Sequence, residues 1–252
     1  MNKAHGLLFK AEMIRAFLHP VNPKTQTRRV PTAANSLVNG YGVSAKRWAA
    51  MQFDWSTACV DGGPSPAGNT GPYLHVKRGD VDEGDELWAR IYPRVQPGDL
   101  IWAKETYCLE RQEEWGQLPP HGDGRAIKRD EEGKWLQPHY RATDPAPELA
   151  HEDGDGEPCV RWKSSLFIPR WASRIERTVV SVRAERVQTI SEADAKAEGV
   201  TADCPVGYIP AAQAAPYGYC FAQLWSEING VESWDANPFA WVYDLQPVSV
   251  AA

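Results

Sequence analysis

The segment at residues 24–29, Lys-Thr-Gln-Thr-Arg-Arg, brings an amine, two hydroxyls and two guanidinium groups into one short stretch. On an extended chain Thr25, Thr27 and Arg29 share one face, and the long stem of Lys24 can swing to the same side. A hydroxyl beside a desolvated amine forms a usable nucleophile–base pair, since desolvation lowers the pKa of a lysine. An arginine adds a permanent charge for a phosphate or carbonyl oxygen. The alternative interpretation is a solvated basic strand edge, which discourages edge-to-edge pairing.

A second candidate, Glu198, lies far along the chain at the end of a helix predicted over residues 191–198. Ser191 and Asp194 resemble a capping box at the start of this helix, and Gly199 is suited to end it. A carboxylate at the C-terminal end faces the negative pole of the helix dipole, a cost of about 0.3–1 kcal/mol. A lysine or arginine from another element would compensate for it. The alternative is a surface glutamate that tolerates this small cost.

The elements that must position these residues follow from hydrophobic periodicity and turn residues. The pattern predicts a strand edge and then a helix over residues 7–19, an extended segment at 25–30, further helices at 191–198 and 217–229, and strands at 73–77, 86–92, 100–107, 173–188 and 239–245. Few helices among several non-local strands predict an α+β barrel. Residues of about 31–70 and 110–160 are polar and rich in glycine and proline. We expect one domain over residues 1–252 with large loop insertions at these two places.

The chain resembles a known protein superfamily at several places. Helix, turn and then Lys24-x-x-Thr27-x-Arg29 resemble the signature of the ASCH superfamily, Gly-x-Lys-x-x-(Glu/Thr)-x-Arg, with Asn22 in place of the glycine. Asparagine is the residue next most tolerant of positive φ, so the turn is expected to survive. The chain also resembles the phage and prophage members of this superfamily at residues 97–106, 168–175, 190–199 and 234–243. The resemblance implies an α+β fold with a PUA-like (ASCH) β-barrel, a few short helices and two large loop insertions.

The chain also resembles a small bacterial ASCH enzyme, the N4-acetylcytidine amidohydrolase, at the same places. Its Lys-Thr-x-Thr-x-Arg segment matches residues 24–29, and its Glu-x-x-Ala-x-x-Glu helix matches Glu192, Ala195 and Glu198. This resemblance implies an amidohydrolase that acts on an N4-acylated or otherwise modified cytidine or pyrimidine nucleoside.

The implied catalytic residues are Lys24, Thr27 and Glu198, and the implied substrate-binding residues are Thr25 and Arg29. Lys24 would take the proton from Thr27, which attacks the amide carbonyl, and Glu198 would hold Lys24 or relay a proton to the leaving amine. Arg29 or backbone N–H groups would stabilise the oxyanion. An alternative makes Glu198 the base for a water, with Thr27 only a ligand contact.

The amino-acid composition limits the classes of protein to which the chain can belong. The 252 residues are 42% hydrophobic and 24% charged, as in ordinary soluble proteins. No apolar run approaches the roughly 20 residues of a membrane helix, and the apolar run near the N-terminus is too short for a signal peptide. We therefore expect a cytoplasmic protein, in the host cytoplasm if it is phage-encoded. The five cysteines form no CxxC pair and the six histidines show no ligand spacing, so we expect free thiols and neither metal nor cofactor.

The net charge of −6 argues against extensive binding of a phosphate backbone, but it leaves room for a small basic pocket for one nucleotide. The expected ligand is a modified nucleoside or nucleotide, and no membrane partner is expected. The sequence leaves two other functions open. One is a non-catalytic PUA-like module of phage origin that binds RNA, single-stranded or modified nucleic acid. The other is a phage assembly or host-interaction protein that uses the fold as a scaffold. The oligomeric state is left open.

Overall fold

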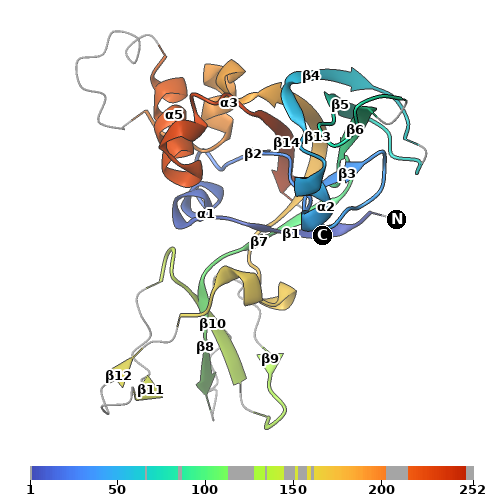
Figure 1. The fold of residues 1–252 in the computed structure, drawn as a ribbon. Helices are drawn as coiled ribbons and strands as arrows, with labels where there is room; N and C mark the ends of the chain where they lie inside the picture. Colours follow the sequence, from blue (N-terminus) through green and yellow to red (C-terminus); the bar gives the residue numbers. More distant parts are fainter. Residues whose placement is uncertain are drawn as a thin grey trace. The chain divides into compact units, whose positions relative to one another are not determined.

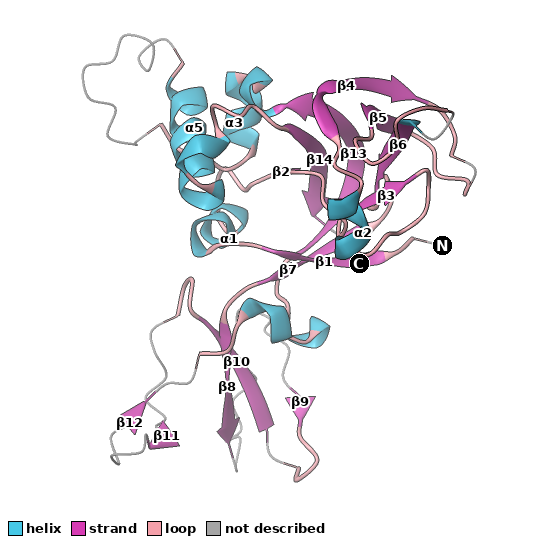
Figure 2. Cartoon of the chain, viewed as in Figure 1, coloured by secondary structure: helices cyan, strands magenta, loops and turns pink. Residues whose placement is uncertain are grey.

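The computed structural model describes residues 2–65, 67–84, 87–112, 128–133, 135–144, 151–152, 158–159, 162–202 and 215–247. Its strands and few helices make an α+β protein, as expected (Figure 2). The chain forms two compact units (Figure 1): the first comprises Met1–Asn22, Leu100–Arg177 and Pro247–Ala252, and the second comprises Pro23–Asp99 and Thr178–Gln246. Each unit is built from separate segments of the chain. One domain over residues 1–252 stays a prediction.

The second unit contains the strands that carry the candidate site. β13 (Glu176–Arg186, most of which lies in this unit), β14 (Phe239–Pro247) and β2 (Gln26–Arg29) are neighbours in that order. β2 runs antiparallel to β14, and their register places Thr27 opposite Tyr243. All three strands lie close to their predicted ranges. Apolar residues alternate in β13 and run almost continuously in β14, and β2 matches the extended segment predicted at residues 25–30.

A second sheet in the same unit is antiparallel throughout, with the order β3 (Ser36–Val38), β6 (Trp88–Pro93), β5 (Pro72–Lys77) and β4 (Asp54–Gly62). The interior side chains of β5 and β6 are fully buried: Leu74, Val76, Ala89 and Ile91. The expected loop character of residues 31–70 is therefore wrong in part, since β3, helix α2 (Ala45–Ala50) and β4 lie there. β4 is a largely exposed edge strand, so its sequence lacks the apolar alternation that identifies a half-buried strand.

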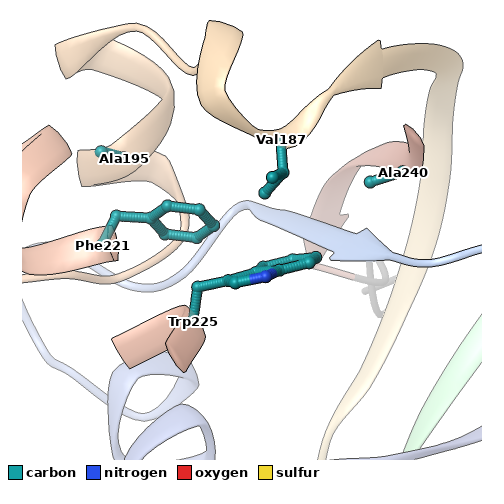
Figure 3. Close-up of a cluster of buried hydrophobic side chains, with 5 residues drawn as sticks. All are labelled: Val187, Ala195, Phe221, Trp225 and Ala240. Atoms are coloured by element: carbon teal, nitrogen blue, oxygen red, sulfur yellow. The ribbon is translucent and has the colours of Figure 1, made fainter. Parts of the chain in front are cut away.

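Two helices of this unit, α3 (Glu192–Ala197) and α5 (Pro216–Asn229), lie side by side. The predicted start and end of α3 are confirmed: Ser191 Oγ accepts from the backbone N–H of Asp194 at 3.0 Å, and Gly199 adopts φ +83° after the last turn. Figure 3 shows Phe221 and Trp225 of α5 directed toward a buried apolar cluster that they share with Val187, Ala195 and Ala240. The cluster holds both helices against the sheet, because Ala240 of β14 belongs to it and Val30, directly after β2, packs against it.

The first unit has its own strands and one described α-helix, α1 (Ala11–Phe17). β1 (Ala4–Leu8) pairs in parallel with β7 (Leu100–Lys104). β8 (Tyr107–Gln112), β10 (Trp135–Tyr140) and β9 (Lys128–Arg129) form an antiparallel sheet, and β11 (His151–Glu152) pairs with β12 (Pro158–Cys159). The expected insertion at 110–160 thus contains strands, while residues 113–127, 134, 145–150, 153–157 and 160 lie outside the described part.

The predicted strand at 100–107 is broken at Glu105 and Thr106, between β7 and β8. Glu105 is buried and accepts a two-pronged hydrogen bond from Arg174, at 2.9 and 2.8 Å. The guanidinium of Arg174 also lies 4.0 Å from the centre of the Tyr140 ring. This ion pair compensates the buried carboxylate of Glu105 at a break in the strand that the hydrophobic pattern does not mark.

The described residues bear on three further expectations, and the barrel among them stays a prediction. None of their sheets closes into a barrel. No described helix combines the length and apolar character that a bilayer crossing requires. Cys59 and Cys108 are free thiols as expected, but Cys220 takes part in a disulfide bond, so the expectation of free thiols is wrong for this residue.

Candidate functional site

The site forms where the C-terminal end of α3 meets the chain just before β2. The backbone N–H of Thr25 donates to the carbonyl of Ala197 at 2.8 Å, and Lys24 Nζ donates to the carbonyl of Glu198 at 2.7 Å. The last carbonyls of a helix have no partner within the helix itself. Residues 24 and 25 supply these partners, so the helix end and the lysine segment are fixed to each other.

Lys24 and Glu198 form a buried ion pair across this junction. Lys24 Nζ contacts Glu198 Oε2, and the side chains are 0% and 1% exposed. The expected cation near Glu198 is thus present, and it offsets the unfavourable position of a carboxylate at the end of a helix. A charged pair is stable in such a site only if its remaining hydrogen-bonding groups are also satisfied. The carbonyl of Glu198 satisfies a further N–H of the ammonium.

Arg28 occupies the other oxygen of the same carboxylate. Its Nη1 donates to Glu198 Oε1 at 3.2 Å, and its Nη2 lies 3.3 Å from Glu185 Oε2 and 3.5 Å from Asp194 Oδ2. The guanidinium also lies 5.8 Å from the ring centre of Phe221. Glu198 therefore has a cation at each carboxylate oxygen, which holds the carboxylate in one orientation.

The network extends from Arg28 along the face of the sheet that α3 covers. Gln26 accepts from Arg28 and donates to Asp194 and Asp244 at 2.9 and 2.7 Å. Arg183 of β13 bridges the same two aspartates, at 3.0 Å from Asp194 Oδ1 and 2.9 Å from Asp244 Oδ2. Positive and negative groups alternate through the network, so each buried charge has a partner of opposite sign.

Burial changes the acid–base properties of the lysine. Desolvation lowers the pKa of Lys24 below its ordinary value, against the attraction of Glu198, and the nearby charges of Arg29 and Arg28 lower it further. A lysine in this state loses its proton more readily than a solvated one. Desolvation also lowers the pKa of Arg29, which interacts electrostatically with Glu198 and Tyr243. Arginine nevertheless keeps its charge in proteins.

The opposite face of β2 carries Thr27 and Arg29, since side chains alternate along a strand. Thr27 is fully buried, and its Oγ1 has no hydrogen-bond partner among the described residues. Tyr243, its cross-strand neighbour on β14, is 1% exposed, and its hydroxyl likewise has none. Most buried hydroxyls in proteins are hydrogen-bonded, and an unsatisfied one costs about 1–3 kcal/mol. Two such groups side by side mark this face as a candidate ligand contact.

The structure thus brings some of the predicted site residues together and keeps others apart. Lys24 contacts Glu198, but no hydrogen bond joins Lys24 to the Thr27 hydroxyl. The Thr25 side chain is exposed, and its backbone carbonyl accepts from Leu245 N at 2.7 Å. Asn22 is not among the described residues with positive φ, so the turn before Lys24 forms without the left-handed conformation expected there.

Several functional candidates were missed in the sequence, above all Arg28, Gln26 and Tyr243. The sequence does contain a signal for Gln26 and Arg28. Together with Lys24 they occupy every second position, so an extended chain places the three polar side chains on one face. Polar residues on a strand face that a helix covers require partners. Tyr243 gave no such signal, because it lies within an apolar strand and its partner across the strands depends on the register.

Comparison with known proteins adds no relative. The chain has no significant match among protein-family models, curated proteins or solved structures. The described residues also contain no group of three His, Cys, Asp or Glu side chains that could hold a metal ion.

Proposed function

We propose that this protein is an amidohydrolase that removes the acyl group from an N4-acylated or otherwise modified cytidine or pyrimidine nucleoside. The observation that carries the proposal is the buried contact between Lys24 and Glu198, which pairs a lysine of lowered pKa with a carboxylate 174 positions away. Strongly perturbed, desolvated ionisable groups gather at catalytic sites, although structural ion pairs share this property. A buried threonine hydroxyl, three residues after the lysine, has no hydrogen-bond partner among the described residues and supports the catalytic interpretation.

In the proposed reaction Thr27 Oγ1 forms a bond to the amide carbonyl carbon while its proton passes to neutral Lys24. The carbonyl electron pair moves onto oxygen and then returns, which breaks the C–N bond. The departing amino group takes the proton from Lys24, leaving an acyl ester on Thr27. Water then hydrolyses this ester to the free acid and restores the hydroxyl. The hydrogen bond from Thr27 to Lys24 would form when substrate is bound, since catalytic hydrogen bonds are often loose in unliganded proteins.

For Glu198 the contacts favour a positioning role over that of a base for water. One of its oxygens contacts Lys24 and the other accepts from Arg28 at 3.2 Å, so its lone pairs are directed at cations. Neither oxygen is directed at a site where a water could be activated, since each contacts a cation. The carboxylate orients the amine, as the acid of a catalytic triad orients its histidine.

A PUA-like (ASCH) β-barrel is our proposal for the fold of the unit that carries the site. Two sheets, β13–β14–β2 and β3–β6–β5–β4, belong to this unit together with a few short helices. Trp241 Nε1 of β14 donates to Ser36 Oγ of β3 at 2.9 Å, and both residues are fully buried. This buried contact between the sheets supports the barrel-like arrangement.

The direct test is hydrolysis of N4-acetylcytidine by the full chain and by Thr27→Val, Lys24→Met and Glu198→Gln. Thr27→Val removes a hydroxyl that makes no hydrogen bond to any residue the structure describes. We therefore expect this variant to fold as stably as the wild type and to lose at least about 10³-fold in kcat, because the covalent step depends on the hydroxyl.

The matched control is Thr32→Val, at an exposed threonine just after β2. It should leave both melting temperature and kcat unchanged. Absence of hydrolysis by the wild type across a panel of N4-acyl cytidines would contradict the proposal. Full activity of Thr27→Val would contradict the threonine nucleophile while leaving an amidohydrolase that activates water.

A second candidate function is a non-catalytic module that binds RNA or modified nucleic acid. It is favoured by a pocket of about 350 Å³ in the same unit, lined in part by Tyr41, Arg47 and Arg78. Tyr41 is 59% exposed, so its ring is available for stacking against a base, and Arg47 is exposed beside it. Weaker nucleic-acid binding by Tyr41→Ala or Arg47→Ala, measured by fluorescence titration, would support this function. Arg78 is a poorer test because it already pairs with Asp80.

A further inference from the structure

The face of β2 that carries Thr27 and Arg29 holds a second polar group that the proposed reaction has not yet used. Thr27 and Tyr243 are directly opposite each other in the register of β2 and β14, so their side chains lie on the same face of the sheet. Both are fully buried or nearly so, and neither hydroxyl has a hydrogen-bond partner in the described part of the chain. Arg29, two positions after Thr27, interacts electrostatically with Tyr243.

We propose that the Tyr243 hydroxyl contacts the acyl carbonyl oxygen of the substrate and donates a hydrogen bond to the oxyanion that forms there. This proposal rests on the proposed function and names a catalytic residue for it. The register supports the role, because side chains directly opposite each other on antiparallel strands have Cβ atoms about 4.5–5.5 Å apart, so both hydroxyls belong to one face of the sheet. The ligand class this implies is an uncharged amide with an accessible carbonyl.

The chemistry of the phenol fits a donor. Burial raises the pKa of Tyr243, with the positive charge of Arg29 acting in the opposite direction, so the hydroxyl keeps its proton at neutral pH. When Thr27 adds to the carbonyl carbon, the π electrons move to oxygen, and a preoriented O–H donor stabilises that charge most where water is excluded. The proton remains on Tyr243, and the electron pair returns when the C–N bond breaks.

A lone unsatisfied hydroxyl would not be sufficient for this inference. Tyr92 on β6 is also fully buried with no hydrogen-bond partner for its hydroxyl among the described residues. Its neighbours are different, since its ring lies 5.1 Å from that of Tyr73, and β6 pairs with β3 and β5 rather than with β2. What distinguishes Tyr243 is its position opposite Thr27 and beside Arg29. Tyr92 therefore provides a matched control.

The experiment compares wild type, Tyr243→Phe and Tyr92→Phe in hydrolysis of N4-acetylcytidine, in binding of the same nucleoside by calorimetry, and in thermal unfolding. Each substitution removes only a hydroxyl that has no hydrogen-bond partner in the described part of the chain, so neither should lower the melting temperature. We expect Tyr243→Phe to lose about 10²-fold in kcat with a small change in KM, as for removal of one oxyanion donor. Tyr92→Phe should retain wild-type kinetics.

The possible results test the role of Tyr243 and the proposed function independently of each other. Wild-type kcat in Tyr243→Phe overturns the role of Tyr243 and leaves the amidohydrolase intact. A lower melting temperature in Tyr243→Phe than in Tyr92→Phe, with equal losses in kcat and binding, overturns it in favour of a structural role. If the wild type binds the nucleoside without hydrolysing it and Tyr243→Phe weakens binding, the amidohydrolase is overturned and the contact with the carbonyl is retained. Absence of both binding and hydrolysis overturns both.

Discussion

At the scale of single residues, the decisive feature is a lysine whose charge is both disfavoured and compensated. Burial lowers the pKa of Lys24, while Glu198 attracts its proton. Such a group releases its proton more readily than an exposed lysine, whose pKa is about 10.4. The carboxylate of Glu198, held by Arg28 on its other oxygen, keeps the amine in place in either state.

This lowered pKa predicts a dependence of stability on pH. Between the folded-state pKa of Lys24 and its unfolded value of about 10.4, the unfolded chain binds more protons than the folded chain. The free energy of unfolding contributed by Lys24 therefore rises with pH across that interval, by at most about 1.4 kcal/mol per pH unit. Conversely, this contribution is lost as the pH falls through the folded-state pKa.

The measurement is urea unfolding of wild type and Lys24→Met between pH 7 and pH 9.5. The difference in free energy, wild type minus variant, should increase with pH. Ionisation of tyrosines occurs in both proteins and cancels in the difference. Parallel profiles would show that Lys24 has the same pKa in the folded and unfolded chains.

At the scale of elements, three residues of helix α3 and its C-terminal end have separate structural roles. Glu192 accepts from the backbone N–H groups of Tyr217 and Gly218 at 3.1 and 2.7 Å, and so caps the first turn of α5. Ala195 is fully buried in the apolar cluster between the helices, and Glu198 reaches the lysine. The spacing Glu-x-x-Ala-x-x-Glu thus places a cap, a packing residue and an ion-pair partner on one short helix.

Removal of the cap gives a prediction at this scale. Glu192→Ala leaves two N–H groups at the start of α5 without their partner and removes a negative charge from the positive end of the helix. We expect the free energy of unfolding to fall by about 1 kcal/mol, as for other lost N-caps. Chemical denaturation measures this, with Glu232→Ala, at an exposed glutamate after α5, as the control that should change little. Equal effects in the two variants would contradict the capping role.

At the scale of the whole molecule, the net charge and the pairing of the cations distinguish the proposed amidohydrolase from the nucleic-acid-binding module. The net charge is −6, and the cations of the site, Lys24, Arg28 and Arg183, are engaged with carboxylates. The burial of Lys24, Thr27 and Glu198 further favours a small nucleoside over a polymer. A binding module for long nucleic acid needs unpaired cations spread over a surface, and these are not supplied by the site itself.

Salt dependence is the corresponding prediction. Hydrolysis of an uncharged nucleoside should change by about twofold or less in kcat/KM between 50 and 200 mM salt, because there is no long-range charge interaction to screen. A module that contacts 6–10 phosphates would lose about 10³–10⁵ in affinity over the same interval. Steady-state kinetics and fluorescence titration at several salt concentrations distinguish the two. A steep loss of RNA affinity together with no turnover would favour the binding module.

The sequence by itself determined several of the local elements and nominated the candidate residues of the site. Apolar periodicity located β13, β14 and α5, and Ser191 and Gly199 marked the ends of α3, because these signals act within a few residues of one another. The same locality explains the need for a cation near Glu198, since the helix dipole is a property of the helix alone.

Only the tertiary structure decided which side chains meet. The contacts of Glu198 with Lys24 and Arg28 join residues 174 and 170 positions apart, and no local pattern specifies such a pairing. The register of β2 against β14 placed Tyr243 opposite Thr27, and a shift of one residue would have placed another side chain there. The pleat then put Thr27 and Arg28 on opposite faces. Local chemistry could therefore nominate the lysine, the threonine and the glutamate, but their partners depend on long-range pairing.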